Sequence, residues 1–194
     1  MKPDPVFTMK QCNDCMLGFN EKGQVVPGKG YTNATLMVVG ERPSYGKTFC
    51  GQKDKILRKS INAFMGIADD RLFFTSMIKC NTDEEQEVDR KLYKAAVTAC
   101  DKHLQRQIEL VDPILIFLVG RPTTLSVLGL PQKITMKSLM NKVYEKDGHN
   151  YWVIWSPGYL IRNERKFKPW KKNLLRAREC FNKLVNEKYP EEVS

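Results

Sequence analysis

The sequence predicts an α/β fold, a three-layer α/β/α sandwich with a four-stranded, mostly parallel central sheet. Short apolar runs typical of buried strands alternate along the chain with longer segments whose apolar residues recur at helical spacing. Several of the apolar runs end in a glycine or in a Ser-Pro-Gly turn. Strands that alternate with helices form mostly parallel sheets covered by helices on both faces, and this gives the predicted fold class.

Four apolar runs are the predicted core strands, residues 35–39, 72–78, 114–119 and 151–155. The third run is apolar throughout, as expected of a central parallel strand that is buried on both faces. In such sheets, ligands bind beyond the carboxyl ends of the strands. The residues that end or follow the runs are therefore the first site candidates: Gly40, Glu41, Ser76, Gly120, Ser156 and Pro157.

The longer segments between these runs are the predicted helices. Apolar residues recur at helical spacing from 57 to 65, and apolar or small residues recur at every fourth position from 92 to 108. Pro122 suits the first turn of a shorter helix that follows Gly120. The last helix has an inner face formed by Phe167, Trp170, Leu174, Phe181 and Leu184.

Length and composition bound the class of protein. With 194 residues the chain is long enough for one sizeable core, and we expect a single domain over residues 1–194. No apolar run reaches transmembrane length, and residues 1–5 lack the apolar core of a secretion signal. We therefore expect a cytoplasmic monomer with no membrane partner, whose cysteines are thiols or ligands rather than disulfides.

Four cysteines form a candidate metal site. Cys12 and Cys15 make a C-x-x-C pair, Cys80 follows a predicted strand, and Cys100 lies on the inner stripe of a predicted helix. Four thiolates suit either tetrahedral zinc or an iron-sulfur cluster, and spacing alone does not separate the two. Free cysteines are also common as small buried hydrophobes, so the spacing leaves a role without metal open.

The charge of the chain indicates its partner. The formal net charge is +10 and the isoelectric point is near 9.3, which favours a polyanion such as nucleic acid. The densest basic stretch runs from Arg162 to Arg178 and is interleaved with Phe167 and Trp170. Such a stretch is also typical of the solvated face of a helix, and charge alone identifies no reaction.

A series of short motifs follows in a fixed order along the chain. They are Cys12 to Cys15, Val-Pro-Gly-Lys-Gly at 26–30, Gly-Glu-Arg-Pro at 40–43, Phe-Cys-Gly at 49–51, Lys79-Cys80, Cys100 ahead of 112–120, and 156–162. In this order they resemble the iron-sulfur uracil-DNA glycosylases, family 4 of the uracil-DNA glycosylase superfamily. The likeness covers most of the chain.

The resemblance implies a function and a set of site residues. Such enzymes flip a base out of DNA into a pocket and hydrolyse its glycosidic bond. Glu41 would place water or stabilise the sugar, Phe49 would stack on the base, and Gly40, Pro43, Pro157 and Arg162 would bind substrate. The resemblance also implies a 4Fe-4S cluster on Cys12, Cys15, Cys80 and Cys100 that acts as a structural staple, with zinc as the alternative.

Two motif positions depart from the family pattern. Ser76 stands where the family has an Asn that reads the uracil edge, and Ser156 stands where it has a His that donates to the leaving uracil. We expect both serines to line the pocket, with Ser156 in the catalytic position. Arg42 and Ser44 add charge and bulk beside the same turn.

These departures leave alternatives to base excision. One is a catalytically inactive glycosylase-fold module that binds DNA, with a replication or repair protein as its partner. Another is a zinc-stapled nucleotide-binding protein, although the chain lacks the Gly-x-x-x-x-Gly-Lys-Ser/Thr run that commonly cradles phosphates.

Overall fold

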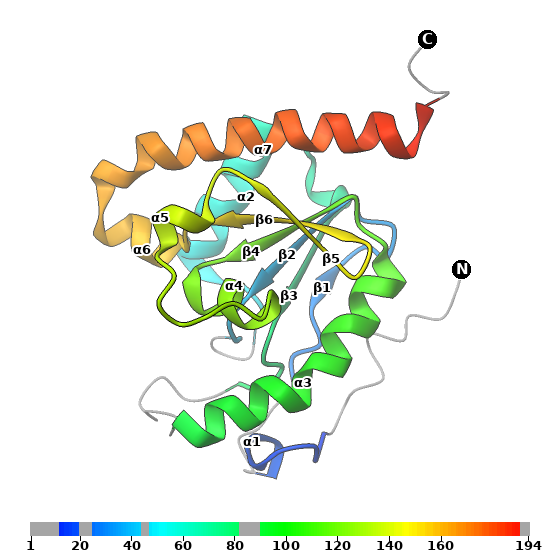
Figure 1. The fold of residues 1–194 in the computed structure, drawn as a ribbon, viewed down its shortest axis with the longest axis vertical. Helices are drawn as coiled ribbons and strands as arrows, with labels where there is room; N and C mark the ends of the chain where they lie inside the picture. Colours follow the sequence, from blue (N-terminus) through cyan, green and yellow to red (C-terminus); the bar gives the residue numbers. More distant parts are fainter. Residues whose placement is uncertain (1–11, 20–24, 44–46, 82–89, 191–194) are drawn as a thin grey trace.

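The central feature of the fold is a six-stranded sheet with helices on both faces (Figure 1). The computed structural model describes residues 12–19, 25–43, 47–81 and 90–190. The strand order is β1-β3-β2-β4-β6-β5. The strands are β1 (Lys29–Gly30), β2 (Leu36–Gly40), β3 (Leu72–Ser76), β4 (Leu115–Val119), β5 (Val143–Lys146) and β6 (His149–Ile154).

The α/β class is confirmed, but the predicted number of strands is wrong. The four predicted strands are β3, β2, β4 and β6, and they pair in parallel. Two further strands, β1 and β5, pair antiparallel at the two edges. β1 has only two residues, too few to show a pattern, and β5 alternates exposed and half-buried side chains as edge strands do.

Helices cover the sheet in two layers. On one face, α2 (Gly51–Met65) and α7 (Phe167–Lys188) pack against alternate residues of the central strands, with Trp170 fully buried among them. On the other face lies α3 (Arg90–Val111), whose inner stripe includes Cys100. The predicted helices are therefore confirmed, but Phe167, which was expected on the inner face of the last helix, is 45 % exposed because it lies at the first residue of α7, where the helix begins. The shorter helices are α1 (Met16–Phe19), α4 (Arg121–Val127), α5 (Met136–Leu139) and α6 (Pro157–Arg162), with single 3₁₀ turns at Asp69–Arg71 and Glu164–Lys166.

The four parallel strands end at the same edge of the sheet, and this edge positions the site. Gly40, the last residue of β2, is paired in register with Ser76, the last residue of β3. The amide of Gly120, after β4, donates to the carbonyl of Ile154, at the end of β6, at 2.8 Å. The turns after β2, β4 and β6 therefore meet in one place. In the described ranges, no helix has the length and hydropathy needed to cross a membrane.

Candidate functional site

A cleft of about 1040 Å³ opens at the carboxyl ends of the parallel strands. Its walls come from the turns after β2, β4 and β6 and from the first turn of α2. Eight of the residues selected from the sequence line it: Gly40, Glu41, Pro43, Phe49, Gly120, Ser156, Pro157 and Arg162. Arg42 also lines the cleft, whereas Ser44 lies outside the described residues.

Ser76 is placed differently from our expectation. It is 1 % exposed and does not line the cleft. Its hydroxyl donates to the carbonyl of Ile78 at 2.8 Å and so stabilises the turn that follows β3. The expectation that Ser76 lines the pocket is wrong, because a short side chain at this position reaches its own backbone first.

Glu41 is held by a partner that the sequence did not reveal. The hydroxyl of Tyr93, in the first turn of α3, donates to Oε1 of Glu41 at 3.0 Å. Burial raises the pKa of Tyr93 well above its ordinary value, and the charge of Glu41 raises it further. Tyr93 therefore stays protonated at neutral pH and fixes one oxygen of the carboxylate. Because the two residues are 52 positions apart, no local pattern could have paired them.

Phe49 forms one wall of the cleft. Its backbone is in the left-handed region, with φ of 52°, which is rare for a bulky residue and typical of functional turns. The ring meets the edge of Phe74, with ring centroids 5.5 Å apart. It also lies against Gly40, where a Cβ would come within 2.7 Å of the ring. Glycine at position 40 thus makes room for the aromatic ring at the mouth of the cleft.

Ser156 lies at the start of α6. Its Oγ accepts a hydrogen bond from the amide of Tyr159 at 3.3 Å, so the residue is the N-cap of that helix. The rings of Trp155 and Tyr159, with centroids 6.2 Å apart, add aromatic surface to the cleft beside it. Both aromatic residues were missed in the sequence analysis, where Trp155 was assigned to the core of a strand.

The electrostatics of the cleft favour an anion. Among the described lining residues Glu41 is the only acid, whereas the basic ones are Arg42, Lys53, Arg121 and Arg162. Lys53 and Arg162 approach each other around Gly158, with atoms 3.4 and 3.7 Å from where a Cβ would stand. The two histidines of the chain, His103 and His149, both lie outside the cleft.

The four cysteines come together on the α3 side of the sheet. Cys80 and Cys100 are 2 % and 3 % exposed, and Cys12 and Cys15 are half-buried. Burial raises the pKa of Cys80 to about 12, and the negative charge of the Cys100, Cys15 and Cys12 thiolates raises it further. Without a metal these groups are neutral thiols at neutral pH, and a metal ion bound among them would displace the protons and take the sulfurs as thiolates. The donor set therefore fits a four-thiolate site.

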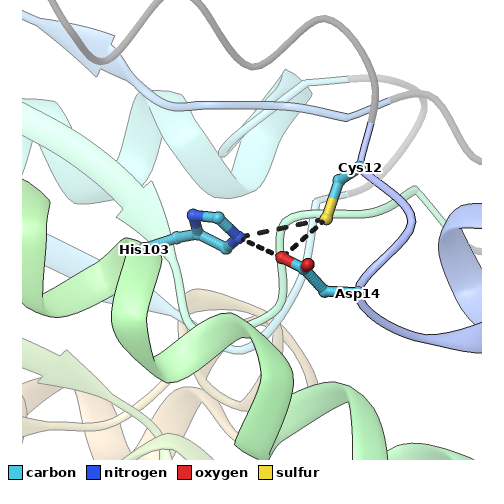
Figure 2. Close-up of side chains that lie close together, drawn as sticks. All are labelled: Cys12, Asp14 and His103. Atoms are coloured by element: carbon cyan, nitrogen blue, oxygen red, sulfur yellow. Dashed lines mark hydrogen bonds and ion pairs between the residues drawn. The ribbon is translucent and has the colours of Figure 1, made fainter.

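A polar cluster fastens the C-x-x-C segment to α3 (Figure 2). Asp14 Oδ2 lies 2.8 Å from His103 Nε2 and 2.9 Å from Lys102 Nζ, and it accepts from Cys12 Sγ at 3.3 Å. Hydrogen bonds from Lys102, His103 and Cys12 hold the pKa of Asp14 well below its ordinary value. The ligand atoms of Cys12, Asp14 and His103 all lie within 4.8 Å of one another, so they too could hold a metal ion. Asp14 stands inside the C-x-x-C loop and His103 follows Cys100 by about one helical turn, a signal that the sequence analysis missed.

Lys79 joins the cysteine site to the turn after β3. Its ammonium is fully buried and donates to Thr75 Oγ1 at 2.6 Å, to the Ser76 carbonyl at 2.7 Å and to Gln107 Oε1 at 2.6 Å. Burial lowers the pKa of Lys79 to about 7. Gln107 also donates to the carbonyl of Pro27. This network fixes the segment between β3 and Cys80 against α3.

Comparison with known proteins agrees with the resemblance seen in the sequence. Residues 27–178 match the family described as the uracil DNA glycosylase superfamily. A type-4 uracil-DNA glycosylase of Saccharolobus solfataricus is 30% identical over 163 residues, which are 78% of this chain and 71% of the relative. One of Sulfurisphaera tokodaii is 34% identical over 122 residues, 58% of this chain and 51% of the relative, so this chain spans about half of that protein. Both of these relatives are type-4 uracil-DNA glycosylases, and the chain belongs to the uracil-DNA glycosylase superfamily.

Proposed function

We propose that this protein is a DNA glycosylase that takes a flipped uracil into the cleft and hydrolyses its glycosidic bond. One observation supports this most strongly. The cleft contains both the carboxylate of Glu41, which Tyr93 holds, and an aromatic wall formed by Phe49, which packs against Gly40. Both lie within the segment that matches the superfamily.

The cleft offers what a flipped base requires. Extrusion of the base from the duplex costs a few kcal/mol, and contacts with the base in the pocket must offset this cost. Stacking of a base on an aromatic ring contributes about 1 to 3 kcal/mol, and Phe49 presents such a ring at the cleft wall. Lys53 and Arg162 add positive charge for the phosphates that flank the flipped nucleotide.

Hydrolysis leaves positive charge on the sugar and negative charge on the uracil, and residues around the cleft can stabilise both. As the bond between the sugar C1′ and N1 of uracil breaks, its electron pair leaves with the base and the sugar becomes positive. Glu41 stabilises that positive charge, orients a water molecule towards C1′ and takes the proton that the water loses. The hydroxyl of Ser156 and the nearby cations offset the negative charge of the departing uracil.

The absence of histidine from the cleft predicts a slow enzyme. The loss of one preorganised donor commonly lowers the rate by about 100- to 1000-fold. Ser156 is the hydroxyl donor that remains at this end of the cleft, and its oxygen already accepts from Tyr159. We therefore propose excision at a rate well below that of a glycosylase with the motif His.

We further propose that Cys12, Cys15, Cys80 and Cys100 hold a 4Fe-4S cluster. The burial of Cys80 and Cys100 and the proximity of the other three cysteines to Cys80, which raises its pKa, support this set of ligands. The cluster would cross-link the C-x-x-C segment, the end of β3 and α3, and it would take no part in the hydrolysis. Purified protein should be brown with broad visible absorbance, and colourless protein with stoichiometric zinc would reject the cluster.

Single-turnover excision tests the proposed function. Protein in excess is incubated with single- and double-stranded DNA that contains one uracil, and abasic sites are then cleaved. We expect product with the wild type and a loss of about 100-fold or more in Glu41→Gln, with little change in affinity for the DNA. Glu145→Gln, an exposed acid on β5, is the matched control and should retain the wild-type rate. If no product forms at high protein excess, uracil hydrolysis is excluded as the function.

A second candidate function has its own observation. The hydroxyls of Ser76 and Ser156 are both engaged with backbone groups, as residues of purely structural turns would be. A module of this kind binds DNA without cutting it and recruits a replication or repair protein. Both candidate functions predict salt-dependent DNA affinity that Glu41→Gln leaves unchanged, so the second is distinguished by the absence of abasic product from the wild type.

A further inference from the structure

The first half of α7 and the 3₁₀ turn before it carry an unbalanced set of positive charges. Residues 165–178 contain no acid, and all their basic side chains are exposed. We call these residues the basic ridge: Arg165, Lys166, Lys168, Lys171, Lys172, Arg176 and Arg178.

This arrangement opposes the stability of the helix. Lys172 lies one turn from both Lys168 and Arg176, and like charges at this spacing destabilise a helix by a few tenths of a kcal/mol per pair. The ridge also begins at the positive end of the helix dipole, where cations are disfavoured and where α7 has no acid. Folding alone therefore gives no reason for this pattern.

Glu164 and Glu179 flank the ridge, but in the part of the chain that the structure describes neither forms an ion pair with it. None of its side chains makes an ion pair there. The second half of α7 differs, because Lys183 pairs with Glu187 at 3.6 Å and Lys188 pairs with Asp112 at 2.8 Å. Solvent ions balance these exposed charges, and a polyanion from another molecule would displace those ions with a gain in entropy.

The position of the ridge identifies that molecule. α7 follows α6 after the single 3₁₀ turn at Glu164–Lys166 and begins near the cleft end of the sheet (Figure 1). Arg162 lines the cleft, and Lys166 Nζ lies 5.9 Å from the ring of Trp155, which also lines it. Positive side chains thus extend from the cleft onto α7, with Glu164 as the one acid between Arg162 and the ridge. Fourteen helical residues extend about 20 Å, which matches about six phosphates of one DNA strand.

We propose that the basic ridge binds the phosphate backbone of DNA outside the cleft, over about six nucleotides on one side of the flipped nucleotide. The inference rests on the proposed function only in taking DNA as the ligand. The ridge contributes affinity and register and makes no contact with the reacting atoms.

Affinity measured against salt concentration tests the proposal. The ridge variant combines Lys168→Gln, Lys171→Gln and Lys172→Gln. The control variant removes three positive charges elsewhere, by Lys94→Gln, Arg106→Gln and Lys183→Gln, all at exposed positions. Each protein is titrated with DNA that carries a stable abasic-site analogue and extends beyond it on the 5′ side, on the 3′ side or on neither. These DNAs have no scissile base, so the result is independent of excision.

We expect the ridge variant to lose about 10-fold or more in affinity for DNA extended on one side, with a salt slope shallower by two to three units. Its affinity for the unextended DNA and its single-turnover rate at saturation should match those of the wild type. Its melting temperature should be unchanged or higher, because repulsion is removed. Equal losses in both variants, or a loss that does not depend on the extension, would overturn the proposal.

Discussion

At the scale of single residues, Ser156 performs two tasks. Its oxygen caps α6, a contact that typically contributes about 1 kcal/mol, and its side chain lines the cleft where the family's motif His would stand. The cap explains why a serine is stable at this position. In the proposed reaction, its hydroxyl would be a weaker donor to the departing uracil than an imidazole.

Restoring the imidazole should therefore restore rate. We expect Ser156→His to raise the single-turnover rate of uracil excision by about 100-fold, while the loss of the cap lowers the melting temperature by a few degrees. Ser156→Ala is the control, because it removes the cap and supplies no donor. A histidine variant no faster than the alanine variant would show that the departing uracil does not lie beside position 156.

At the scale of elements, the end of β2 and the turn that carries Phe49 form one unit. A Cβ at position 40 would stand 2.7 Å from the ring of Phe49 and would push the ring from its place beside Phe74. The strand end thus sets the aromatic wall of the cleft.

A double-mutant cycle tests this coupling. Gly40→Ala should weaken binding of DNA that contains a flipped uracil by about 10-fold, because stacking on the displaced ring is lost. In a Phe49→Ala background the same substitution should add little, since no ring remains to be displaced. Losses that add in the double variant would contradict the contact.

Tyr151, on β6, gives a prediction for pH. Its side chain is fully buried, and its hydroxyl has no hydrogen-bond partner among the described residues. Burial raises the pKa of Tyr151 from 10.0 to about 12. Between these values the unfolded chain loses the proton and the folded chain keeps it, so the free energy of unfolding falls as pH rises through this window, by about 3 kcal/mol.

Tyr151→Phe should remove this fall in the free energy of unfolding at high pH. We expect denaturant titrations of the variant to show about 1 kcal/mol more stability at neutral pH, because an unpaired buried hydroxyl is gone. The difference from the wild type should widen from pH 10 to pH 12. Parallel curves for the two proteins across this range would contradict the assignment.

The elements also show how far a sequence can predict this fold. The parallel strands and long helices follow from apolar spacing, which burial imposes directly. The β5–β6 hairpin was missed although Asp147-Gly148, both at positive φ, is a strong hairpin signal. The contacts Tyr93–Glu41 and His103–Asp14 join residues 52 and 89 positions apart, and such pairs depend on packing that no local pattern contains.

At the scale of the whole molecule, the cysteine site and the cleft share their supports. The amide of Ile78 donates to the carbonyl of Glu41 at 2.9 Å, two residues before Cys80. The side chain of Tyr93 holds the carboxylate of Glu41 from the same helix that carries Cys100. Both supports of Glu41 therefore lead to predicted cluster ligands.

Removal of the proposed 4Fe-4S cluster should loosen Glu41 before it unfolds the sheet. We expect protein treated with chelator and oxidant to melt several degrees lower and to show faster amide hydrogen exchange at Met77 and Ile78. Amides of β4, at the centre of the sheet, should keep their protection. If amide exchange at residues 77 and 78 did not change, the cysteine site would not support the position of Glu41.

The central claim is that this cleft breaks the bond between uracil and deoxyribose. The most direct measurement is the amount of free uracil released from DNA that contains one uracil per strand, followed by mass spectrometry with the wild-type protein in excess. The account predicts one free uracil for each abasic site formed, with slow release that depends on Glu41. DNA that stays bound and intact, with no free uracil after long incubation, would contradict it.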